Sequence, residues 1–95
     1  PVRVVSPVDG TITNIYSVID GALTTGNATL TAAINGNAVT NGVVTVTQAG
    51  SAAGDVDVAS PSAANTVAAG DLIAITPGGT NDAARTAAIT LLIET

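Results

Sequence analysis

The chain has 95 residues and a formal net charge of −5, with seven acidic residues and only two cations. This length corresponds to one small domain. The charge excludes nucleic-acid binding, which needs Lys and Arg for phosphate contacts, and adhesion to anionic membranes. His and Cys are both absent, which excludes the usual zinc sites, Ser-His and Cys-His nucleophile pairs, and disulfides.

The composition predicts an all-β protein with a thin core. Long helix-forming side chains are scarce, whereas Val, Ile and Thr, which suit a pleated and half-buried surface, are frequent. Tyr16 is the only aromatic residue. Burial of a Val, Ile or Leu contributes about 1.5–3 kcal/mol, and an Ala methyl only about 0.8 kcal/mol. We therefore expect the fold to be completed by self-association or by docking onto a larger surface.

Residues 1–8 are expected to be extended, because Pro1 and Pro7 disfavour helix. This segment is either an edge strand or an arm that lies on a neighbour, and residues 9–95 are expected to form a single β-sandwich domain. The start has no continuous apolar region, so it is not expected to be a signal peptide, and Pro1 is expected to follow a removed initiator Met. The residues of the arm expected to bind a partner are Val2, Arg3, Val4, Val5 and Val8.

A strand is predicted over residues 11–19, with apolar side chains on both faces, so it is expected to pack on two sides. Tyr16 lies in this strand and is expected to be a core or inter-subunit ring. Clean alternation predicts the next strand over residues 28–34. Asn-Gly pairs at 35–36 and 41–42 both predict tight hairpin turns, and a further strand follows over residues 43–48.

Asp55, Val56, Asp57 and Val58 alternate and place both acids on one face of a strand, which Pro61 ends. The last third of the chain predicts a closing hairpin. One strand starts near residue 70, residues 77–79 turn the chain, and the last strand ends near residue 93.

In this hairpin, Leu92 lies on the face opposite to the other apolar residues, and Arg85 is one of only two cations. We expect both residues at contacts between subunits. The whole chain then has seven or eight short strands separated by turns, a spacing typical of a β-sandwich or barrel.

No catalytic pattern or phosphate-binding loop is found, so the chain is not expected to be an enzyme or to hold a cofactor. Asp55 and Asp57 could form a pair of the glycosidase type, but the aromatic walls of a sugar site are missing. Calcium is an alternative for Asp55, Asp57, Asp71 and Asp82, although such residues near Gly and Asn usually bind local backbone in turns.

The stretch D-G-T-I-T-N-I-Y-S-V-I-D-G-A-L-T-T-G-N-A-T-L-T-A-A-I-N-G, followed by A-A-G-D-L-I-A-I-T-P-G-G-T-N-D, resembles the small head decoration, or cement, proteins of tailed bacteriophages. The likeness spans residues 9–93 and rests on turns and strand patterns. It implies a jelly-roll-like sandwich that assembles as a trimer on the outer surface of the virion capsid. The implied partner is the major capsid protein, and the place of synthesis is the host cytoplasm.

Two alternatives stay open at this point. The same pattern is compatible with a receptor- or glycan-binding β domain of a phage fibre or spike, although a single aromatic residue is little for glycan stacking. It is also compatible with another β-structural subunit, such as one from a tail tube or a surface array, which would form rings or filaments by itself.

Overall fold

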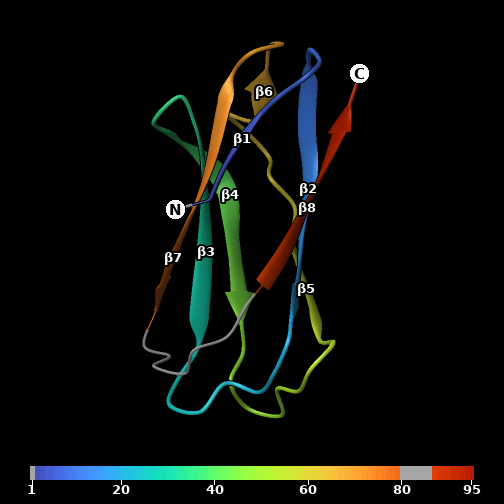
Figure 1. Ribbon diagram of the computed structural model, residues 1–95. Coiled ribbons are helices and arrows are strands. Elements are labelled where there is room, and N and C mark those ends of the chain that lie inside the picture. The colour runs from blue at the N-terminus through green and yellow to red at the C-terminus, as the bar shows by residue number, and fades with distance from the viewer. Residues whose placement is uncertain (1, 80–86) are drawn as a thin grey trace.

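Within the residues that the structure describes, the chain forms eight strands in two antiparallel sheets (Figure 1). The structure, a computed structural model, describes residues 2–79 and 87–95. The prediction of an all-β sandwich with seven or eight strands is confirmed. The strands are β1 (Val2–Val5), β2 (Gly10–Ile19), β3 (Ala28–Ile34), β4 (Asn37–Val46), β5 (Val56–Ala59), β6 (Thr66–Val67), β7 (Leu72–Gly79) and β8 (Ala87–Glu94).

We call the two layers sheet A and sheet B. Sheet A has the strand order β1-β7-β3-β4. In sheet B, the long strand β2 pairs with β5 and β6 on one side and with β8 on the other. The outer strands β4 and β5 meet across the sandwich, where Thr40 of β4 also bridges to Ala63. The opposite edges of the two sheets are β1 and β8.

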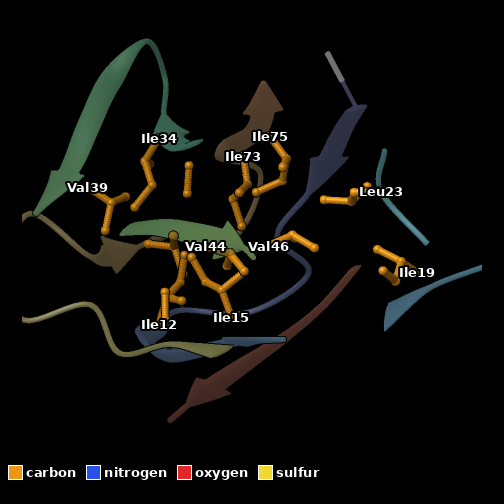
Figure 2. Packing of buried hydrophobic residues seen from close by; sticks show 13 residues of the cluster. Ile12, Ile15, Ile19, Leu23, Ile34, Val39, Val44, Val46, Ile73 and Ile75 are labelled. Carbon is orange, nitrogen blue, oxygen red and sulfur yellow. The ribbon is translucent and has the colours of Figure 1, made fainter. Parts of the chain in front are cut away.

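The core lies between the sheets and consists of aliphatic side chains (Figure 2). Ile12 and Ile15 of β2 and Ile73 of β7 are almost completely buried, as are Val44 and Val46 of β4. Alternation along β4 supplies Val44 and Val46, because successive side chains of a strand point to opposite faces. In β2, a bulge between Ile12 and Asn14 lets Ile12 and Ile15 both face the core. No aromatic side chain belongs to this cluster.

The first predicted Asn-Gly turn is confirmed and the second is wrong. Asn35 and Gly36 join β3 to β4 with φ angles of 49° and 86°. At Asn41 and Gly42 the chain does not reverse; residues 39–42 bulge from β4 opposite a single residue of β3. Gly42 is needed there because a Cβ would lie 2.7 Å from the Cβ of Val39, which the bulge turns into the core.

The predicted closing hairpin is wrong, because its two strands lie in different sheets. β7 pairs with β1 and β3 in sheet A, whereas β8 pairs with β2 in sheet B. Residues 77–79 do not turn the chain and continue β7 alongside β3. The predicted faces are nevertheless correct: Ile73 and Ile75 are buried, and Leu92 is exposed on the side opposite to its apolar neighbours.

The N-terminal segment is an edge strand over Val2–Val5, one of the two forms expected for it. β1 pairs antiparallel with β7, and all four of its residues are exposed. Val8, in the connection to β2, is exposed as well.

Candidate interaction surface

Three of the acidic side chains hold turns together through backbone N–H groups. Asp55 accepts a hydrogen bond from Ala52 at 2.8 Å, and Asp71 accepts one from Ala68 at 2.8 Å. Asp9 accepts one from Ala69 at 2.7 Å. No group of three or more potential metal-ligating side chains occurs in residues 2–79 and 87–95, so the calcium alternative gains no support from them.

Hydrogen bonding lowers the pKa of Asp71 below its ordinary value of 3.8. The backbone N–H of Ala68 is the main cause, and the side chain of Asn35 adds to it. Asn35 in turn accepts a hydrogen bond from the N–H of Leu72 at 2.9 Å, which ties the β3–β4 turn to the start of β7. This polar group is structural, because it joins two turns.

An apolar part of the surface covers the outward side of β5, β2 and β8, which we call the outer face of sheet B. Tyr16 of β2 lies beside Val58 of β5 and Thr90 of β8, and Val18 lies beside Val56 and Ala88. Leu92 lies beside Asn14. The exposed large apolar residues of this face are Tyr16, Val56, Val58 and Leu92.

The outer face is formed because β5 turns its valines outward. Val56 and Val58 are 65% and 52% exposed, whereas Asp57 lies on the inward side beside the buried Ser17. An inward-pointing charge on an edge strand is a recognised way to discourage unwanted strand pairing. The two valines were missed from the sequence, because alternation alone does not say which side of a strand faces the core.

The structure brings Tyr16 and Leu92, two predicted inter-subunit residues, onto one face. Arg85, the third, lies outside the described residues. The predicted partner-binding residues Val2, Arg3, Val4 and Val5 lie elsewhere, on the free edge of sheet A. Surface contacts can therefore be made at two separate places, the outer face of sheet B and the edge strand β1.

Among the residues that the structure describes, none covers the side of the sandwich between β1 and β8 with a further strand. In the described part of the chain, the ladders of β1 and β8 are made only with β7 and β2, respectively. Apolar side chains line a cavity of about 560 Å³ there, among them Val2 of β1, Ile75 of β7 and Ile89 of β8. The inward residues of β8 are consequently only partly buried.

Comparison with known proteins finds no match: no protein-family model, no curated protein and no solved structure is significantly similar to the chain. Residues 2–79 and 87–95 include no helix that is long and apolar enough to span a membrane. The surface itself must therefore carry any functional argument.

Proposed function

We propose that this protein is a structural virion protein, a decoration protein that binds the outer surface of a phage head as a trimer and stabilises contacts between major capsid proteins. The observation that carries the proposal is the outer face of sheet B. In a chain with a net charge of −5, this face presents Tyr16, Val56, Val58 and Leu92 to solvent, and Glu94 at the end of β8 is the only charged residue among its outward strand positions.

Contiguous exposed apolar side chains on a small protein mark an interaction site. A sheet face with a single charged residue, Glu94 at one end, is suited to a flat and apolar protein surface, since almost no charge has to be desolvated on contact. The acids at turns, by contrast, keep the rest of the molecule hydrated and soluble. These features support a static structural contact with one partner.

The proposal assigns the outer face of sheet B to the capsid. The resemblance of residues 9–93 to decoration proteins supports the kind of partner, and the exposed apolar face supports the place of contact. The sequence-based prediction differs: it places Tyr16 and Leu92 at contacts between subunits, and it assigns binding of the major capsid protein to the N-terminal residues. The experiment below separates the two assignments.

The test measures cosedimentation of the purified protein with empty heads of the phage that encodes it. We expect saturable binding, and we expect the double variant Val56→Thr, Val58→Thr to bind at least about tenfold more weakly, because two apolar contacts become polar without loss of β-branched shape. Val43→Thr is the matched control, since Val43 is 45% exposed on the outward side of sheet A.

Full binding by the double variant would contradict the assignment of this face. Failure of the unchanged protein to bind heads, together with binding to host-cell surfaces, would instead favour the fibre or spike alternative. Circular dichroism of each variant establishes that the sheets are intact.

A further inference from the structure

On the side of the sandwich between β1 and β8, two strand edges have backbone hydrogen-bonding groups that no described strand pairs with. Free edges of this kind are natural sites for pairing with another chain. β8 is a long and apolar edge that contains neither Lys nor Pro. β1 is short, but it has a Val on each of its faces, and Val2 and Val5 are 56% and 61% exposed.

Hydrogen bonds fix which residues of β1 have free backbone groups. The N–H of Ser6 donates to the carbonyl of Asp71 at 2.9 Å, so the backbone of Ser6 points towards the β7 side. Backbone direction alternates along an antiparallel strand, which turns the groups of Arg3 and Val5 to the free edge. The side chains of these two residues lie on the outward side of sheet A, because Val2 and Val4 pair with the buried Ile75 and Ile73.

The same reasoning applies to β8. Ile19 exchanges backbone hydrogen bonds with Asp55 and Gly54, on the β5 side of β2. Alternation along β2 then directs Val18, Tyr16 and Asn14 to β8, where they pair with Ala88, Thr90 and Leu92. The free groups of β8 therefore belong to the residues between these, namely Ile89, Leu91 and Ile93.

We propose that β1 of one copy pairs in parallel with β8 of a second copy. In a parallel pair, a residue whose backbone groups point to the other strand forms two hydrogen bonds with that strand. Its partners are the residues just before and just after the one that lies opposite to it. Arg3 beside Leu92 would thus bond Leu91 and Ile93, which are the residues with free groups. The faces also match, because Val4 then lies beside Ile93 on the inward side.

Charge favours this pairing over pairing of identical edges. Arg3 is the cation of β1, and Glu94 is the acid of β8. With Arg3 beside Leu92, Glu94 lies two residues further along the same face, within reach of the long Arg side chain. Pairing of β1 with β1, or of β8 with β8, would bring like charges together instead.

The direction of the strands permits a closed ring. β1 and β8 run towards the same end of the molecule (Figure 1), so rotation about an axis along the strands leaves them parallel between copies. Each copy then offers one edge to the copy before it and the other edge to the copy after it, which closes a ring. The pairing of β1 with β8 specifies how copies of the chain associate in the proposed function. The number of copies, three, is taken from that proposed function.

The first test uses introduced cysteines, because the natural chain has none. Chains that carry Val4→Cys are mixed with chains that carry Ile93→Cys and are oxidised. Adjacent strands lie about 4.8 Å apart, within the range that a disulfide spans. We expect a disulfide-linked heterodimer from the mixture, and no covalent dimer from either variant alone or from Val4→Cys mixed with Val43→Cys.

The second test is a charge reversal, followed by light scattering in the absence of heads. We expect Arg3→Glu and Glu94→Arg each to weaken association about tenfold, and the double variant to restore it, because opposite charges face each other again. Cross-linking of Val4→Cys with itself would overturn the proposal, as would association that no reversal alters. These outcomes do not depend on head binding, so they are distinct from failure of the proposed function.

Discussion

Asp71 and Asn35 show how single polar residues position whole strands in a protein with few apolar contacts. The N–H of Asn35 donates to the carbonyl of Leu72 at 2.8 Å, and the side chain of Asn35 accepts from the N–H of the same residue at 2.9 Å. Asp71 closes the preceding turn through Ala68. The start of β7 is therefore held by side chains as well as by its ladder.

The lowered pKa of Asp71 predicts a pH dependence of stability. Because its folded pKa lies below 3.8, the ionised carboxylate contributes stability above about pH 3.8, and this contribution is lost as the pH falls through the folded pKa. We expect Asp71→Asn to lower the melting temperature at pH 7 and the difference from the unchanged protein to shrink towards pH 2. Calorimetry at several pH values measures it.

Asp57→Asn is the control, since it removes the same charge from a carboxylate that accepts no backbone hydrogen bond within the described residues. A difference between Asp71→Asn and the unchanged protein that stays constant from pH 7 to pH 2 would contradict this role of Asp71.

At the scale of elements, the sequence predicted the spans of strands and some of their turns. It did not predict to which sheet a strand belongs. The span of β3 and its turn at Asn35 and Gly36 follow from alternation and from positive φ angles, which are properties of neighbouring residues. Whether β8 pairs with β7 or with β2 depends on contacts between distant residues, and the alternation of Ile89 and Leu91 along β8 is compatible with both. The candidate face was predictable only in part for the same reason: Tyr16 and Leu92 were found, but the valines of β5 were not.

Gly79 tests how closely β7 approaches β3. Its φ is 96°, and an added Cβ would contact the carbonyl oxygen of Asn27 and lie 3.0 Å from the Cα of Ala28. Backbone atoms cannot easily move aside, so we expect Gly79→Ala to cost more than about 2 kcal/mol in the free energy of unfolding. Urea denaturation measures the change.

Gly36→Ala is the matched control. Gly36 also has a positive φ, of 86°, but nothing lies within 4 Å of the added Cβ. Only the backbone conformation is penalised there, which corresponds to about 1–2 kcal/mol. Equal costs at the two glycines would show that the contact with Asn27 contributes nothing.

At the scale of the whole molecule, the apolar interior and the side between β1 and β8 both leave the separate chain with little buried apolar surface. The core has no aromatic side chain, and the inward residues of β8 are only partly covered. Burial of these residues in an assembly would add the apolar contact that the separate chain lacks. The net charge of −5 opposes association, and this repulsion is weakest where faces with few charges meet or where Arg3 meets an acid.

This coupling of folding to assembly predicts that the melting temperature depends on protein concentration, since mass action stabilises whichever state the partner copies bind. For a trimer, a hundredfold rise in concentration adds about 2 kcal/mol per subunit, or roughly 10 °C for a domain of this size. Differential scanning fluorimetry with an external dye measures the shift. Arg3→Glu should melt at a lower temperature that changes little with concentration, because its ring contact is weakened. If the melting temperature of the unchanged chain is constant across this range, the separate subunit is fully stable without its neighbours. Pairing of β1 with β8 between copies then adds nothing to the stability.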